Sequence, residues 1–212
     1  MGEMIESLNE KKLKELNDYL RNKSPKAIIE WALFIAKRPI VTTNFKPFSA
    51  SLLHAISNIK KDIKTIWCDT GYNTRSTYLH AEVLISKLSL NIFVYVPKQT
   101  TGHRDSVLGI PEVDTPEHDI FTDQVKLEPF KRALEEHNPD VWFTNLRKGQ
   151  TVHRDNLDIV TKDKNGIIKV CPFYYWSDAE LENYLIEYKL PNEHKYFDPT
   201  KVLANRECGL HV

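Results

Sequence analysis

Cysteine is scarce in this chain of 212 residues, and the placement of its cysteines argues against several classes of protein. Cys68, Cys171 and Cys208 are an odd number at wide spacing, and no two of them form a CxxC pair. Zinc sites, iron–sulfur sites and disulfide scaffolds need more closely grouped cysteines. We therefore expect no metal site, and we expect reduced thiols.

Net charge and long apolar runs are missing as well. The 29 Lys and Arg residues balance the 29 Asp and Glu residues, so nothing favours nucleic acid or an anionic membrane as a partner. No run approaches the roughly 20 apolar residues of a membrane helix. Met1 is followed by Gly2, Glu3 and further charged residues, with no apolar stretch that resembles a secretory signal. We expect a cytoplasmic protein that binds neither nucleic acid nor membrane.

Glycine is also sparse, with 7 residues, and no GxGxxG or Walker pattern occurs. What the chain does have is apolar material for a core. Hydrophobic residues make up 41% of it, and these include 9 Phe, 9 Tyr and 4 Trp. Composition and length are those of a folded protein, and we expect a single domain over residues 1–212.

Helical and strand-like segments alternate along the chain. An amphipathic helix is expected within residues 1–23, and a second helix begins at its N-cap Ser24. Strands are expected at 40–45, 65–68, 91–96, 141–143 and 167–170, and further helices at 48–58, 76–88, 128–137 and 177–188. Residues 97–127 are expected to form a long irregular connection. The alternation of helices with nearly continuous apolar strands predicts an α/β fold with a doubly wound, mostly parallel sheet.

Ligands of such sheets bind beyond the carboxyl ends of the strands, so the residues that follow the strands are the candidates for a site. After the first strand, the polar side chains that precede and begin a helix suit a phosphate; they are Thr42, Thr43, Asn44 and Ser49. The alternative for this segment is an ordinary capped turn. After the second strand, Asp69 and Gly71 suit an adenine or ribose donor, or serve only as turn residues.

Positive charge gathers after the fourth strand of the predicted series. Arg147 and Arg154 follow this strand, and Lys169 lies on the next one. Guanidinium groups bind planar and tetrahedral anions through paired hydrogen bonds, so a phosphate or sulfate site is one interpretation. A solvated basic loop is the other.

The C-terminal end carries a cysteine in a charged setting. Cys208 lies beside Arg206 and His211, whose positive charge would favour the thiolate. A mobile C-terminal tail over residues 198–212 with an activated thiol suits covalent sulfur transfer, because the nucleophile must meet two partners in turn. An incidental surface cysteine is the alternative. Cys68 and Cys171 lie inside apolar strands and are expected to be inert core residues.

Four motifs, in the right order, resemble the phosphoadenylylsulfate (PAPS) reductase family. The most specific is the ending Glu207–His211, which reads ECGLH. The others are Asp69–Tyr72 with Thr77-Tyr78, the segment Trp142–Arg147 with Gln150, His153-Arg154 and Asn156-Leu157, and Lys169–Pro172 with Trp176. Together they cover the chain from about residue 24 to its end.

The resemblance implies an adenine-nucleotide α-hydrolase-like fold and an activity in sulfate assimilation. PAPS would be reduced to sulfite and adenosine 3′,5′-bisphosphate, with reducing equivalents from thioredoxin or glutaredoxin and without an iron–sulfur cluster. Cys208 would be the nucleophile, assisted by Arg206 and His211. The substrate-binding residues would be Thr42, Thr43, Asn44, Ser49, Asp69, Gly71, Arg147, Gln150, Arg154 and Lys169. A homodimer is compatible with the resemblance.

Two features depart from the family pattern. Lys46 stands where the family's phosphate loop usually has glycine, and the stretch between Leu190-Pro191 and the tail is short. Three alternatives therefore stay open: a reductase that uses adenylylsulfate (APS), an ATP pyrophosphatase-like enzyme, and a non-catalytic adenine-nucleotide-binding module. The second needs a glycine-rich SGGxDS loop, which residues 42–51 lack.

Overall fold

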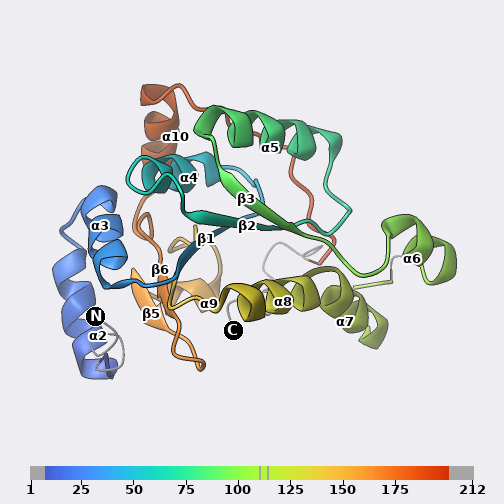
Figure 1. Ribbon diagram of the computed structural model, residues 1–212, viewed down its shortest axis with the longest axis horizontal. Helices are drawn as coiled ribbons and strands as arrows, with labels where there is room; N and C mark the ends of the chain where they lie inside the picture. The colour runs from blue at the N-terminus through green and yellow to red at the C-terminus, as the bar shows by residue number, and fades with distance from the viewer. Residues whose placement is uncertain (1–7, 110, 114, 201–212) are drawn as a thin grey trace.

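The computed structural model describes residues 8–109, 111–113 and 115–200. Its centre is a six-stranded sheet in the order β3-β2-β1-β4-β6-β5 (Figure 1). The strands are β1 (Pro39–Thr43), β2 (Lys64–Cys68), β3 (Asn91–Tyr95), β4 (Val141–Phe143), β5 (Val160–Lys162) and β6 (Ile168–Val170). All neighbouring pairs are parallel except β5 with β6. The predicted α/β fold with a doubly wound, mostly parallel sheet is confirmed.

Helices cover both faces of this sheet (Figure 1). They are α2 (Glu10–Leu20), α3 (Pro25–Ile35), α4 (Ser49–Ser57), α5 (Arg75–Leu88), α6 (Thr101–Val107), α7 (Pro116–Thr122), the π-helix η1 (Asp123–Leu127), α8 (Glu128–His137), α9 (Val152–Asp155) and α10 (Asp178–Glu187). In the described ranges, none of them is long and apolar enough to cross a membrane.

Successive apolar side chains of a strand alternate between the two faces of the sheet, which explains why both faces are covered by helices. Val41 of β1 belongs to the larger core cluster, together with buried residues of α3, α4, α5 and α10. Its neighbour Ile40 belongs to a second cluster, with Phe130 and Ala133 of α8. Successive side chains of a strand point to opposite faces, so an uninterrupted apolar strand needs a helical layer on each side.

The expectation for residues 97–127 was wrong, because this connection contains α6, α7 and η1 rather than an irregular loop. The helix-start signals are present in the sequence. Thr100 accepts a hydrogen bond from the backbone N–H of His103, and Thr115 accepts one from His118. Pro116 occupies the first turn of α7, where the missing N–H has no cost. These helices are short, so they show little of the 3.6-residue periodicity by which longer helices are recognised.

Two small elements were not expected, and the end of β1 differs by more than one residue. β5 and α9 have three and four residues, too few for a periodic pattern. β1 ends at Thr43, two residues before the expected end of the strand. The last helix begins with a capping box, in which Ser177 and Glu180 are bonded reciprocally. Part of the N-terminal helix expectation and most of the expected tail lie outside the described residues.

Candidate active site

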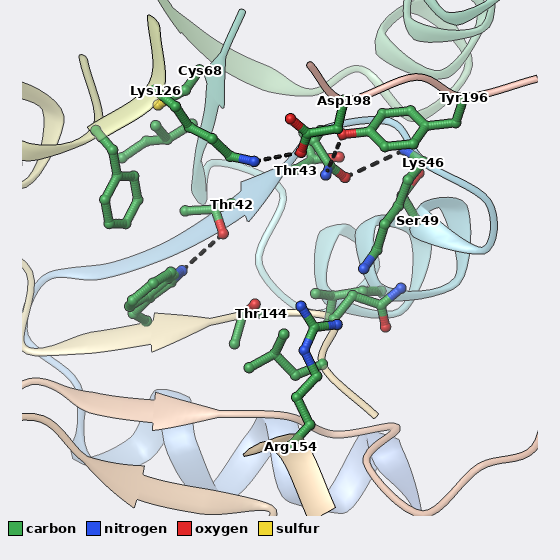
Figure 2. A pocket seen from close by; sticks show the side chains of 17 residues that line it. Thr42, Thr43, Lys46, Ser49, Cys68, Lys126, Thr144, Arg154, Tyr196 and Asp198 are labelled. Carbon is green, nitrogen blue, oxygen red and sulfur yellow. Dashed lines mark hydrogen bonds and ion pairs between the residues drawn. The ribbon is translucent and has the colours of Figure 1, made fainter. Parts of the chain in front are cut away.

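A pocket lies where the sheet order changes direction, at the carboxyl ends of β1 and β4. Its cavity has a volume of about 170 Å³. Side chains from the loops after β1 and β4 line it, together with residues of η1, α9 and the segment 191–200 (Figure 2). Parallel sheets bind ligands at such points because the loops diverge there and leave a crevice. The sequence-based expectation that the site follows these strands therefore agrees with where the pocket lies.

Four of the residues predicted after β1 line this pocket: Thr42, Thr43, Asn44 and Ser49. The hydroxyl of Thr42 accepts a hydrogen bond from the indole N–H of Trp142 at 2.8 Å. The amide group of Asn44 donates to the Tyr196 hydroxyl at 2.8 Å. Ser49 is the first residue of α4 and is buried, and its hydroxyl has no hydrogen-bond partner among the described residues.

Arg154 is the predicted basic residue that reaches the pocket. It lies in α9 and is only 6% exposed. Its Nη1 donates to Gln150 Oε1 at 2.6 Å, and the same oxygen accepts from the backbone N–H of Arg147 at 3.1 Å. Gln150 therefore orients the guanidinium group of Arg154 but does not itself line the pocket.

Two other predicted cations lie outside the pocket lining. Arg147 is buried against α10, where it pairs with Asp178 at 2.6 Å and stacks over the ring of Phe48. The ammonium group of Lys169 lies 5.1 Å from the ring centre of Trp142, and burial lowers its pKa. The structure therefore does not bring the three predicted cations together at one point.

Asp69 and Gly71 form a turn beside the pocket rather than part of its wall. One oxygen of Asp69 accepts hydrogen bonds from the backbone N–H of Gly71, from Asn73 and from the hydroxyl of Tyr78, at 2.8–3.0 Å. Gly71 has φ +81, and an added Cβ would lie 2.3 Å from the hydroxyl of Thr101. Within the described contacts, both residues shape the turn.

Lys126 and Asp198 were missed by the sequence analysis, and both line the pocket. Their side chains form a buried ion pair, and Thr200 Oγ1 accepts from Lys126 at 3.1 Å. Burial alone would raise the pKa of Asp198, but the charge of Lys126 and the hydrogen bonds outweigh it, so this pKa lies below its usual value. Lys126 lies in η1, inside the connection that was expected to be irregular, and no motif marked it.

The segment 191–200 crosses the pocket, as Tyr196 and Asp198 in Figure 2 show. Asn192 holds one end by accepting from the backbone N–H of Phe48 at 2.9 Å. In the middle, the hydroxyl of Thr74 donates to the backbone oxygen of Lys195 at 2.9 Å. Together with the pair of Lys126 and Asp198, these contacts tie the segment to three parts of the chain.

Neither described cysteine is an activated nucleophile. Cys68 lines the pocket wall, half-buried rather than in the core, and burial raises its pKa to about 12. Cys171 is buried, and burial likewise raises its pKa to about 12. Both thiols are therefore protonated at neutral pH. Arg206, Cys208 and His211, the predicted catalytic residues, lie outside the described residues.

The pocket combines positive charge with hydroxyl and amide groups. Lys46 and Arg154 contribute the charge, whereas the charge of Lys126 is balanced by Asp198 in the same lining. Such a lining suits a phosphorylated or sulfated small molecule. Within the part of the chain that the structure describes, no group of three or more His, Cys, Asp or Glu side chains is placed to hold a metal ion.

Comparison with known proteins gives consistent likenesses. A family model for the phosphoadenosine phosphosulfate reductase domain matches residues 38–198. A phosphoadenosine 5′-phosphosulfate reductase of Synechococcus sp. is 32% identical, over 94% of this chain and 97% of the relative. One from Photobacterium profundum is 31% identical, over 94% and 88% of the two chains.

Solved structures extend the comparison to the fold. The phosphoadenylyl-sulfate reductase of Candida auris, solved as a phosphate complex, superposes with a TM-score of 0.77 at 25% identity and covers 88% of this chain and 90% of its own. The FMN adenylyltransferase of Candida glabrata has a TM-score of 0.58 at 12% identity, over 90% of this chain and 62% of its own. The predicted adenine-nucleotide α-hydrolase-like architecture agrees with these likenesses.

Proposed function

The chain belongs to the phosphoadenosine phosphosulfate reductase family, and on this premise we propose that it reduces PAPS to sulfite and adenosine 3′,5′-bisphosphate. The observation that carries the proposal is the pocket at the carboxyl ends of β1 and β4, which places the cationic side chains of Lys46 and Arg154 around a space lined by hydroxyl and amide groups. A substrate with several anionic groups matches this lining.

We infer that Cys208 is the nucleophile, because it lies in a charged setting, whereas burial raises the pKa of Cys68 and of Cys171 to about 12. Its thiolate attacks the sulfur atom of the substrate's sulfate, and the bond from this sulfur to the bridging oxygen breaks. Adenosine 3′,5′-bisphosphate leaves with the electron pair, and Cys208 carries an S-sulfonate. Arg206 and His211 lie close in sequence and would favour the thiolate.

Thioredoxin or glutaredoxin supplies the two electrons. A thiolate of this partner attacks the Cys208 sulfur and releases sulfite, which leaves a mixed disulfide. The second thiol of the partner then resolves the disulfide and frees Cys208. No step of this sequence needs an iron–sulfur cluster.

The predicted binding residues take different parts in this scheme. Thr43, Asn44, Ser49 and Arg154 line the pocket, so we assign them to the nucleotide's anionic groups. Gln150 orients Arg154. We assign Arg147 and Lys169 to support of the loop and of Trp142, because their charged ends contact these elements. Asp69 and Gly71 remain candidates for the adenosine.

Sulfite release from PAPS, with reduced thioredoxin, tests the proposal. Cys208→Ser is expected to abolish sulfite release while adenosine 3′,5′-bisphosphate still binds, because only the nucleophile is lost. Cys171→Ser is the matched control: it is expected to lower stability and to retain turnover per folded molecule. In a single turnover without thioredoxin, the intact mass should rise by one sulfonate and return to its starting value when thioredoxin is added.

Parallel assays with APS separate the alternatives. Extra charge-assisted contacts to the 3′-phosphate contribute about 1.5–3 kcal/mol, so kcat/KM for PAPS should exceed that for APS at least about tenfold. Equal efficiency would favour the APS-using alternative. Nucleotide binding with no sulfite from either substrate would identify a non-catalytic module, and undiminished turnover by Cys208→Ser would refute the mechanism.

A further inference from the structure

The sheet has two edge strands, β5 and β3, and among the described residues a helix closes only one of them. α2 lies along β5, where the side chain of Asn17 binds both backbone groups of Val160. β3 pairs with β2 alone, on its inner side. An edge strand presents a row of unpaired N–H and C=O groups, which proteins usually shield with charge, proline or a covering element. The strand Asn91–Tyr95 contains no charged residue and no proline.

The backbone groups of Val94, at the centre of this edge, point away from the sheet. The oxygen of Tyr95 accepts from the backbone N–H that follows β2, at 2.9 Å, so Tyr95 faces β2. Successive residues of a strand turn their backbone groups to opposite sides, so those of Ile92, Val94 and Val96 face outward. The guanidinium group of Arg132 donates to the oxygen of Val96 at 2.8 Å, which agrees with this orientation. The edge is therefore open from Ile92 to Val94.

Apolar side chains flank this open backbone on both faces of the sheet. β3 runs between α5 on one face and α8 on the other (Figure 1). On the α5 face, Val94 and Val96 are 49% and 52% exposed. On the α8 face, Phe93 is half-buried with its ring centre 4.8 Å from that of His137, and Tyr95 is buried. Exposed aliphatic groups beside unpaired backbone groups are typical of a contact surface.

The sequence of this edge is complementary to itself about Val94. When a second copy pairs antiparallel around a two-fold axis through Val94, the two Val94 residues exchange their N–H···O=C hydrogen bonds. Ile92 then lies opposite Val96 of the second copy, and Phe93 lies opposite Tyr95 of the second copy. Aliphatic groups meet on one face and aromatic rings on the other, and both are favourable cross-strand pairs. The oxygen of Val96 has a second lone pair for the N–H of Ile92.

α8 carries matching charges along the same edge. Arg132 and Glu136 are four positions apart, so they project from one side of the helix. This side lies next to β3, because Arg132 binds Val96 and lies 5.6 Å from the ring centre of Tyr95. The two-fold axis sets the α8 helices of the two copies antiparallel, which brings Arg132 of one toward Glu136 of the other. Such charge complementarity favours a second copy as the partner, because an unrelated strand would not carry it.

We propose that the β3 edge is the interface of a homodimer, in which two β3 strands pair antiparallel and join two six-stranded sheets into one continuous sheet. The contact is isologous, so each copy covers the open edge of the other and the assembly stops at two. α2 closes the far edge of each sheet, which leaves no free edge for growth. This inference does not rest on the proposed function.

Sedimentation velocity of the full chain, over a range of concentrations, tests the oligomeric state. We expect a dimer with twice the chain mass of 24.7 kDa. Val94→Lys should raise the dissociation constant of the dimer at least about tenfold, because two ammonium groups then meet at the axis and two aliphatic side chains leave the interface. Val83→Lys is the matched control. Val83 is 52% exposed on the solvent face of α5, and its replacement should leave the dimer intact.

A second pair of variants tests the charges on α8. Glu136→Lys should raise the dissociation constant about two- to tenfold, because Arg132 of the second copy then faces a like charge. Its control is Glu135→Lys. Glu135 is exposed on another side of α8, where it pairs with Lys131, and its replacement should leave the dissociation constant unchanged. Circular dichroism checks that each variant is folded.

Hydrogen exchange locates the contact on β3 itself. The Val94 amide points outward, so it should exchange at least about tenfold more slowly in the dimer than in the diluted monomer. The Tyr95 amide, which faces β2, should be protected in both states. The inference is overturned if the chain stays monomeric at the highest concentration measured, or if larger assemblies grow with concentration. A dimer that Val94→Lys leaves unchanged, or in which the Val94 amide exchanges as fast as in the monomer, overturns it as well.

Discussion

The pair formed by Lys126 and Asp198 is a buried ion pair that joins η1 to the segment across the pocket. The side chains are 9% and 6% exposed. The pKa of Asp198 lies below the ordinary value of about 3.9, because the charge of Lys126 and hydrogen bonds outweigh the effect of burial. A carboxyl with a lowered pKa stabilises the fold fully above its unfolded pKa. This stabilisation is lost as the pH falls from about 4 through the folded value.

Asp198→Asn is expected to lower the free energy of unfolding at pH 7 by about 3 kcal/mol, because a buried ammonium group loses its counter-charge while Thr200 still accepts from it. The variant should also lose less stability than the unmodified protein between pH 5 and pH 3. Urea unfolding at several pH values measures both effects. In the control Asp62→Asn, which breaks an exposed pair with Lys60, the free energy of unfolding should change much less than in Asp198→Asn. Equal costs for the two variants would contradict this account.

At the scale of elements, α2 closes the open edge of the sheet. Asn17 of α2 is buried, and its side-chain amide supplies the donor and the acceptor that a neighbouring strand would offer to Val160 of β5. Its Oδ1 accepts from the backbone N–H of Val160, and its Nδ2 donates to the backbone oxygen, each at 2.9 Å. An unpaired edge strand is a template for aggregation, so this side chain protects as well as stabilises.

Asn17→Ala should leave the N–H and C=O groups of Val160 without partners and lower the free energy of unfolding by about 2 kcal/mol or more. Exchange of the Val160 amide proton should become faster, because its acceptor is gone. Chemical unfolding and hydrogen exchange measure the two effects. Asn22→Ala, in the exposed turn after α2, is the control and should change stability by less than about 0.5 kcal/mol. An unchanged amide exchange rate at Val160 would argue against the edge-closing role.

The sequence predicted an element or a contact well when the element was long or the contacting residues were close together in the sequence. The longer elements have an apolar pattern of their own, and the helix at 128–137 was placed at the correct residues. Asn17 gave no such signal, because its partner lies 143 positions away. Lys126 and Asp198 were missed for the same reason, since a contact between residues 72 positions apart leaves no local pattern. Gln150, in contrast, was predicted as a site residue because it belongs to a motif. Only the structure shows that it orients Arg154.

At the scale of the whole molecule, the pocket lies between the two halves of the sheet. β1, β2 and β3 form one half, and β4, β6 and β5 form the other. A ligand that binds the loops after β1 and β4 therefore contacts both halves. Because such a ligand binds only the folded chain, it should stabilise the fold as a unit.

Adenosine 3′,5′-bisphosphate at about 100 times its Kd should add about 2.7 kcal/mol to the free energy of unfolding. For a chain of this size, this corresponds to a rise of about 5–11 °C in Tm. Differential scanning calorimetry measures the shift. Adenosine at the same concentration is the control and should give a smaller one, because it lacks the anionic groups that the pocket binds. Equal shifts for both ligands would show that the phosphates are not recognised.

The anchoring of Thr200 at the edge of the pocket has a consequence for the rate of the first chemical step. Lys126 donates to the hydroxyl of Thr200, and Cys208 follows only eight positions later. Eight residues span at most about 26–29 Å even when fully extended. In the proposed mechanism this tether gives the thiol an effective molarity toward a bound substrate on the order of millimolar. The proposed attack on the sulfur would then be a unimolecular event, whose frequency is set by a tether rather than by diffusion from solution.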